Sequence, residues 1–85
     1  MTLSIEVSKY PLAEEYINAI QDFIDRMNQY KDLEVVTNTM STQIFGPYDS
    51  LMKAFTKEMK GSFKTMDMIN IFVVKFINAD LRPNQ

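Results

Sequence analysis

Residues 2–8 read TLSIEVS, and this alternation, together with the helical pattern that follows it, decides the fold. Leu3, Ile5 and Val7 occupy one face of an extended chain, while the intervening positions are polar. A hydrophobic period of two predicts a strand with one buried face. We expect the strand to end at Pro11, because proline has no N–H group to donate to a sheet.

The period changes to that of a helix in the segment from Ala13 to about Gln29. Apolar residues recur there three or four positions apart and form one stripe, which comprises Tyr16, Ile17, Ile20, Phe23, Ile24 and Met27. Such a stripe predicts an amphipathic helix that packs on a core. Arg26, near the expected end of the helix, has the charge that suits the helix dipole there.

Two short segments with β-branched residues, Leu33–Thr37 and Thr39–Phe45, predict a hairpin that turns around Asn38. Gly46-Pro47 then interrupts the chain. A hairpin makes the second and third strands antiparallel neighbours.

A second helix is expected after this interruption, with Asp49 or Ser50 as its N-cap and Gly61 as its C-cap. Its apolar stripe contains Leu51, Phe55 and Met59. The last element, Met66–Asn78, is predicted to be a strand that is apolar at both parities. Such a strand needs cover on both of its faces.

The elements therefore follow the order strand, helix, strand, strand, helix, strand. This order predicts a ferredoxin-like βαββαβ sandwich of the α+β class, in which an antiparallel four-stranded sheet carries both helices on one face. We expect a single domain over residues 1–80 and a loose polar tail over residues 81–85.

The apolar last strand also predicts self-association. In a monomer, one of the two rows of its side chains lies on the sheet face without helices. That row contains either Ile69, Ile71, Val73 and Ile77 or the residues of the other parity. Burying one such side chain contributes roughly 1.5–3 kcal/mol. We therefore expect a homodimer or a dimer of dimers, and the alternative is that a bend or the tail covers this face.

The composition of the 85-residue chain excludes several classes of chemistry. There is no cysteine and no histidine, which excludes disulfides, thiolate metal sites and Ser-His-Asp catalysis. The net charge of −2 and the two glycines argue against nucleic-acid binding and against a glycine-rich phosphate loop. With neither a secretion signal nor a membrane-spanning segment in the pattern, we expect a soluble cytoplasmic protein that needs no metal or cofactor.

A polar run around the expected hairpin turn is the most unusual feature of the chain. Residues 37–43 read TNTMSTQ. Ser41 and Gln43 of this run lie on one face of the expected sheet. If the polar residues of the first strand, Ser4, Glu6 and Ser8, share that face, the five side chains line a polar concavity. The alternative is an ordinary solvated sheet face.

Two motifs resemble those of a known family. Ser8-Lys9-Tyr10-Pro11-Leu12 is similar to an SxYPL opening after a first strand, and Met40-Ser41-Thr42-Gln43-Ile44-Phe45-Gly46 is similar to an MSTxIxG hairpin. Together they resemble the YkoF-like family and its single-domain thiamine-binding relatives, over roughly residues 4–80. The resemblance implies a ferredoxin-like domain that binds thiamine or its hydroxymethylpyrimidine moiety, and a single-domain chain that pairs with itself.

The resemblance places a ligand site at the positions that match its motifs, namely Ser8, Tyr10, Ser41 and Thr42, and also Thr37 and Asn38. A pyrimidine ring needs an apolar or aromatic wall, for which Tyr10, Met40 and Phe45 are the candidates. A thiazolium cation favours acidic or aromatic surroundings, and Glu6 is the nearest carboxylate.

We therefore expect a small-molecule binding protein that acts in sequestration, delivery or sensing, and not an enzyme. A second interpretation is a non-catalytic module for oligomerisation or protein interaction. A third is a small enzyme in which Glu6 or Tyr10 serves as the base in a dimer cleft.

Overall fold

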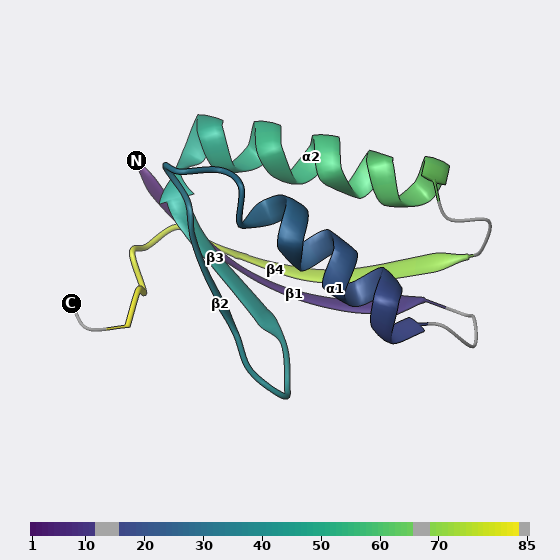
Figure 1. The fold of residues 1–85 in the computed structure, drawn as a ribbon. Coiled ribbons are helices and arrows are strands. Elements are labelled where there is room, and N and C mark those ends of the chain that lie inside the picture. The colour runs from purple at the N-terminus through teal and green to yellow at the C-terminus, as the bar shows by residue number, and fades with distance from the viewer. Residues whose placement is uncertain (12–15, 66–68, 84–85) are drawn as a thin grey trace.

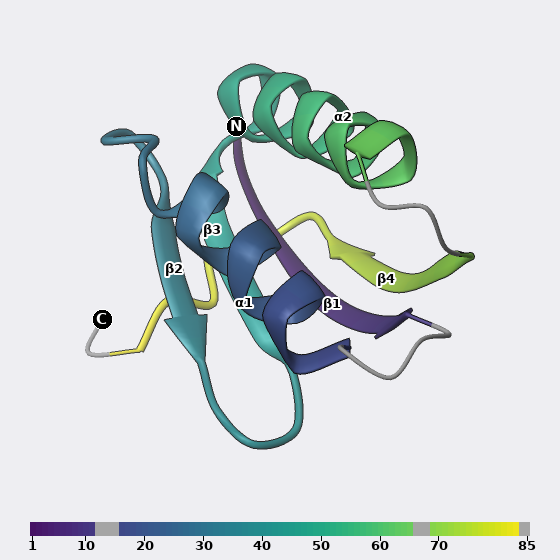
Figure 2. The same cartoon turned by 45° about the vertical axis from the view of Figure 1, so that its right-hand side comes forward.

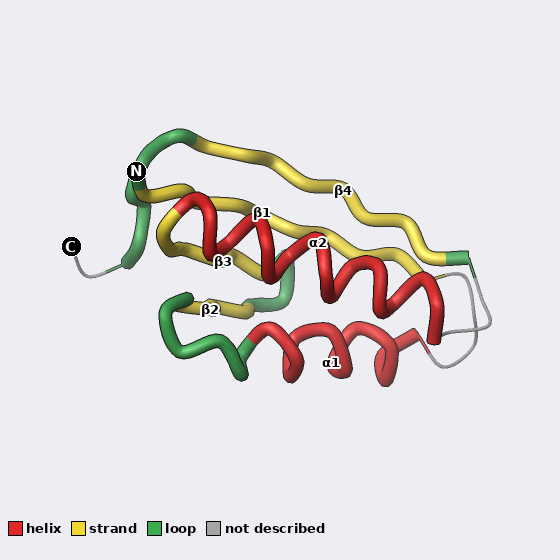
Figure 3. Tube along the Cα trace, turned by 90° about the horizontal axis from the view of Figure 1, so that it is seen from above, coloured by secondary structure: helices red, strands yellow, loops and turns green. Residues whose placement is uncertain are grey.

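The structure is a computed structural model that describes residues 1–11, 16–65 and 69–83. Six elements follow one another along the chain (Figure 1): β1 (Thr2–Pro11), α1 (Tyr16–Met27), β2 (Glu34–Thr37), β3 (Thr42–Pro47), α2 (Tyr48–Thr65) and β4 (Asn70–Ile77). The strands form one antiparallel sheet in the order β2-β3-β1-β4. Both helices lie on the same face of this sheet (Figure 3). The predicted ferredoxin-like βαββαβ sandwich is therefore confirmed.

β1 organises the core because it is a central strand, paired with β3 on one side and with β4 on the other. Its predicted inward residues, Leu3, Ile5 and Val7, are almost fully buried beneath the helices. They contact a cluster supplied by both helices and β3, namely Phe23, Met27, Ile44, Leu51, Ala54 and Phe55. The alternation of β1 thus determines which face of the sheet the helices cover.

The hairpin starts β3 later than expected. β3 begins at Thr42 and not at Thr39, because residues 38–41 form the connecting loop. The Asn38 side-chain oxygen accepts hydrogen bonds from the backbone N–H groups of Met40 (2.8 Å) and Ser41 (3.1 Å). Asparagine favours turns because its side chain bonds to backbone N–H groups in this way. The turn therefore lies at Asn38, as the sequence predicted.

The predicted caps of the second helix are wrong. α2 begins at Tyr48, immediately after Pro47, so Asp49 and Ser50 lie inside its first turn. Gly61 lies inside the helix as well, which continues to Thr65. A Cβ atom at position 61 would lie 2.8 Å from Nη1 of Arg26. This glycine therefore gives the arginine of α1 room between the two helices.

β4 is covered on one face only within a single chain. Phe72 and Val74 pack against the core, while Ile71 and Val73, on the face without helices, are 43% and 52% exposed. β4 begins at Asn70, and the predicted start at Met66 lies outside the described residues, as does the predicted helix start at Ala13.

The segment after β4 returns to β1 on the open face of the sheet. The Ser4 hydroxyl donates a hydrogen bond to the Ala79 carbonyl (2.6 Å) and accepts one from the Leu81 backbone N–H (3.0 Å). The segment predicted to be loose from residue 81 onward is thus bonded to the sheet at its first residue. It reaches the Ser4 end of the open face and leaves Ile71 and Val73 exposed.

Leu51→Ala should lower the free energy of unfolding by about 2–5 kcal/mol, because it empties a fully buried position of α2 against the sheet. Leu81→Ala is the matched control, since Leu81 is 57% exposed and its truncation should cost less than about 0.5 kcal/mol. Urea denaturation measures both values. Equal losses in the two variants would contradict the described core.

Candidate ligand-binding site

A cavity of about 500 Å³ lies where β1 ends, between α1 and the turn of the β2–β3 hairpin. Figure 2 shows this part of the fold, with α1 in front of β1 and β3 and the hairpin loop extending past the helix. The lining comprises Val7, Ser8, Lys9, Tyr10, Ile20, Phe23, Ile24, Thr37, Asn38, Thr39, Met40, Ser41 and Thr42. A cavity of this volume accommodates a small organic molecule.

Six of the seven residues that the sequence predicted for a ligand site line this cavity: Ser8, Tyr10, Thr37, Asn38, Ser41 and Thr42. They come from two segments far apart in the sequence. The antiparallel pairing of β1 with β3 brings these segments together, since Val7 lies opposite Thr42. The structure therefore places the six residues around one cavity, and their role in binding stays a prediction.

The apolar wall of the cavity comes mainly from α1 and comprises Ile20, Phe23 and Ile24, with Val7 of β1. Met40 and Tyr10 also border the cavity, but both side chains are largely exposed and Tyr10 has the parity of the open face, so their predicted role as a wall stays a prediction. Phe45 does not line the cavity. It lies opposite Ser4, further along β3 from the hairpin turn, so Phe23 takes the aromatic position that Phe45 was predicted to fill.

Short-range hydrogen bonds hold the rim of the cavity in one shape. The hydroxyl oxygens of Thr37 and Thr42 lie 3.2 Å apart across the hairpin. The backbone N–H of Asn38 donates to the Ser41 carbonyl (3.1 Å), in addition to the two bonds that the Asn38 side chain accepts. Hydroxyl and amide groups therefore stand at defined positions before any ligand arrives.

Glu6 lies on the opposite face of the sheet and does not line the cavity. Its carboxylate accepts a hydrogen bond from the Ser41 hydroxyl (2.9 Å) and pairs with the Lys75 ammonium (3.4 Å). The Gln43 amide donates to the same Ser41 hydroxyl (2.7 Å). The predicted polar set of the open face thus exists in part, with its groups bonded to one another.

Lys9 is a cavity residue that the sequence reasoning missed. Its side chain is 8% exposed, and its ammonium donates to the Ala19 carbonyl (2.9 Å) and to the Ser62 hydroxyl (3.4 Å). The ammonium also lies 5.7 Å and 5.4 Å from the ring centroids of Phe23 and Phe72, within the range of cation–π attraction. Burial, and next the charge of Arg26, lower the pKa of Lys9.

The alternation of residues along β1 already indicated that Lys9 is buried. Position 9 continues the inward parity of Leu3, Ile5 and Val7, so a charged residue there is directed toward the helices and not toward solvent. Charged residues are rarely buried without partners, which marks this position as unusual.

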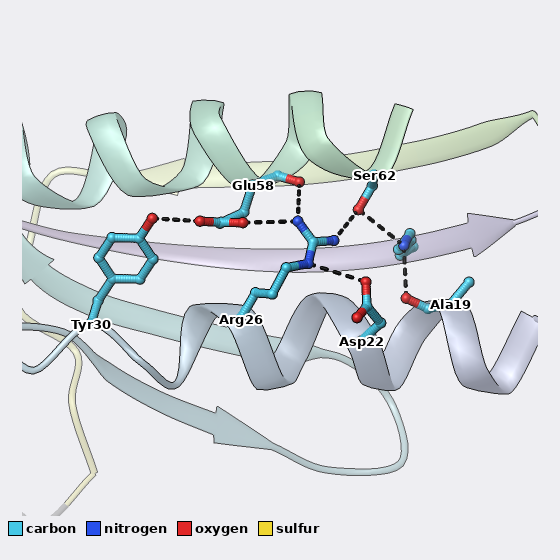
Figure 4. A network of polar contacts seen from close by, with 7 residues as sticks. Ala19, Asp22, Arg26, Tyr30, Glu58 and Ser62 are labelled. Carbon is cyan, nitrogen blue, oxygen red and sulfur yellow. Dashed lines mark hydrogen bonds and ion pairs between the residues drawn. The ribbon is translucent and has the colours of Figure 1, made fainter. Parts of the chain in front are cut away.

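A polar network beside Lys9 joins the two helices (Figure 4). The Arg26 guanidinium donates to the Glu58 carboxylate (2.8 Å), the Glu58 carbonyl (2.9 Å), the Ser62 hydroxyl (2.6 Å) and the Asp22 carboxylate (3.1 Å). The Tyr30 hydroxyl donates to the other oxygen of Glu58 (2.5 Å). A cation that bonds to both helices at four points fixes the position of α1, and with it one wall of the cavity.

The network also shifts pKa values. Burial of the Glu58 carboxyl opposes its ionisation, but the bonds donated by Tyr30 and Arg26 outweigh burial, and the pKa of Glu58 lies below its ordinary value of 4.5. The same bond to Glu58, followed by burial, raises the pKa of Tyr30.

Two further features are absent from the part of the chain that the structure describes. No helix there is long and apolar enough to cross a membrane. No cluster of acidic side chains in residues 1–11, 16–65 and 69–83 is suited to hold a metal ion.

Solved structures of distant sequence share this architecture. A hypothetical protein from Methanocaldococcus jannascii matches with 26% identity over 99% of this chain and 87% of its own, at a TM-score of 0.77. A candidate thiamine biosynthesis or salvage protein from Thermotoga maritima matches with 10% identity over 96% and 85% of the two chains, also at 0.77. A DUF77 domain of unknown function from Bacillus cereus matches with 14% identity over 95% and 79%, at 0.76.

These matches show which fold the chain shares. The chain is a ferredoxin-like domain that shares its fold with a DUF77 domain and with a candidate thiamine biosynthesis or salvage protein. No protein-family model matches the chain, and no curated protein matches it. The fold shared with these solved structures supports the resemblance to YkoF-like proteins at the level of the fold alone.

Glu58→Gln should lower the free energy of unfolding by about 1–3 kcal/mol at pH 7, because Arg26 and Tyr30 lose a charged acceptor. The folded-state pKa of Glu58 is depressed, so its contribution is complete above the ordinary value of 4.5 and is lost as the pH falls below it. Denaturant titrations at pH 7 and pH 3 should therefore give a smaller difference at pH 3.

The exposed Glu34→Gln variant serves as the control and should change stability by less than about 0.5 kcal/mol at either pH. A Glu58→Gln loss that is equally large at pH 3 and pH 7 would contradict the ionic role of Glu58.

Proposed function

We propose that the protein binds thiamine or its hydroxymethylpyrimidine moiety without converting it, and that it acts in the cytoplasm in sequestration, delivery or sensing. The observation that carries this proposal is the cavity beside α1, whose lining contains six residues selected from the sequence motifs alone. The likeness of fold to a candidate thiamine biosynthesis or salvage protein supports the same ligand class.

The cavity has the two features that an aminopyrimidine needs. A flat ring is favoured by the apolar wall of α1, where Phe23 offers an aromatic surface. The ring nitrogens and the amino group need donors and acceptors, which the hydroxyls of Thr37 and Thr42 and the amide of Asn38 supply at the rim. Hydroxyl groups suit both needs because each can donate and accept.

The side chains around the cavity favour binding over turnover. Of its described lining residues, Lys9 and Tyr10 are the ones with an ionisable side chain, and Lys9 is engaged with Ala19 and Ser62. Glu6, the alternative catalytic base, is bonded to Ser41 and Lys75 on the other face of the sheet. General acid–base catalysis needs a titrating group within hydrogen-bond reach of the substrate.

Thr42→Val should weaken the binding of hydroxymethylpyrimidine by about 3–10-fold in calorimetric titration, because it removes one buried hydroxyl at the rim and preserves the shape of the side chain. Thr56→Val, on the outer side of α2, is the matched control and should bind like the unmodified protein. Absence of heat and of thermal stabilisation at millimolar thiamine and millimolar hydroxymethylpyrimidine would refute the proposed function.

A second proposal concerns self-association through the open face of the sheet, as a homodimer or a dimer of dimers. Tyr10, Ile69, Ile71 and Val73 gather there at one end of β1 and β4, and each is more than two-fifths exposed. β4 is an edge strand of the sheet. A second copy of the chain offers the same patch, and a two-fold axis brings identical patches together. An oligomerising module is the alternative function that this face supports.

Val73→Lys should shift the protein from dimer to monomer in sedimentation velocity at micromolar concentration, because it places a charge in the apolar patch. Thr56→Lys adds the same charge on α2 and should leave the association unchanged. An unmodified protein that sediments as a monomer would refute this second proposal and leave the ligand proposal intact.

A further inference from the structure

We infer that Lys9 makes the cavity select ligands without positive charge, so that the neutral hydroxymethylpyrimidine binds in preference to the thiazolium cation of thiamine. This inference rests on the proposed function and narrows it to one form of the ligand. Lys9 is then the residue that determines specificity, and its charge acts on the ligand at a distance.

The charges around the cavity carry the inference. Its described lining includes one cationic side chain, Lys9, and no carboxylate. The nearest network carboxylates, Asp22 and Glu58, both accept hydrogen bonds from the Arg26 guanidinium and do not line the cavity. The carboxylate of Glu6 pairs with Lys75 on the opposite face of the sheet. The Lys9 ammonium lies 5.7 Å from the ring of Phe23, a lining residue, so a ligand in the cavity is exposed to its charge with no carboxylate in the described lining to offset it.

The ammonium of Lys9 is also held in place. The Ala19 carbonyl and the Ser62 hydroxyl accept its hydrogen bonds, and two phenylalanine rings flank it. A buried charge acts over a longer range than an exposed one, because the surrounding protein and the bulk salt screen it weakly. Burial first, and then the charge of Arg26, lower the pKa of Lys9, while the Asp22 carboxylate acts in the opposite direction.

The aromatic wall does not reverse this preference. Phe23 is the ring that lines the cavity, and its face already lies near two cations, at 5.7 Å from the Lys9 ammonium and 5.9 Å from the Arg26 guanidinium. The attraction that an aromatic ring offers a cation is thus in use within the protein. A neutral aminopyrimidine needs only the apolar surface and the polar rim.

Calorimetric titration of the unmodified protein with three probes tests the inference. The probes are hydroxymethylpyrimidine, thiamine, and an uncharged isostere of thiamine in which carbon replaces the thiazolium nitrogen. We expect hydroxymethylpyrimidine and the isostere each to bind at least about tenfold more tightly than thiamine. The isostere separates charge from size, because it has the shape of thiamine without its charge.

Lys9→Met removes the charge and keeps an unbranched side chain, and we expect it to reduce the preference for the isostere over thiamine to less than about threefold. Lys60→Met is the matched control, since Lys60 is exposed on α2 and outside the cavity, and it should retain the full preference. Circular dichroism establishes that both variants are folded. If Lys9→Met does not fold, the three-probe comparison on the unmodified protein still decides.

The outcomes separate the two proposals. Thiamine that binds as tightly as its isostere, or more tightly, would overturn the charge selection and leave the proposed function standing. An isostere that binds as weakly as thiamine would show exclusion by size and would also overturn the inference. Failure of all three probes to bind would overturn the proposed function together with this inference.

Discussion

The pairing of β1 with a strand on each side is the constraint on which the rest of the structure depends. A central strand has its backbone groups satisfied at both edges, so its side chains point strictly to one face or the other. On the helix face this rule buries Leu3, Ile5 and Val7, and at the next inward position it buries the ammonium of Lys9. One strand therefore builds both the core and the charged part of the cavity.

The second organising contact is polar and lies between the helices. Arg26 of α1 bonds to two residues of α2, and Gly61 leaves it the space to do so. Ser62 joins this network to Lys9, because its hydroxyl lies within reach of both cations. The cavity wall on α1 is thus fixed through a polar contact with α2, at a site where buried Lys9 and half-buried Arg26 share the Ser62 hydroxyl as an acceptor.

The sequence predicted the elements well and their ends less well. Strong periodicity in residues 2–8 and in the stripe of α1 reflects burial, which tertiary structure preserves. The ends depend on contacts that no local pattern contains: Gly61 resembled a C-cap but serves the close approach of Arg26. For the site, the motifs indicated six lining residues, whereas Phe45 and Glu6 were assigned to the cavity although β3 and β1 direct them elsewhere.

The sequence by itself determined the order of elements, the inward face of β1 and the position of the polar hairpin, because each depends on the chemistry of neighbouring residues and on a fixed backbone period. The register between β1 and β3 and the packing of α1 onto the sheet were decided only by the tertiary structure. These long-range pairings place Thr42 opposite Val7 and bring Lys9, Phe23 and Ser62 together across three elements. Local sequence carries no information on such distances, since they result from the packing of the whole domain.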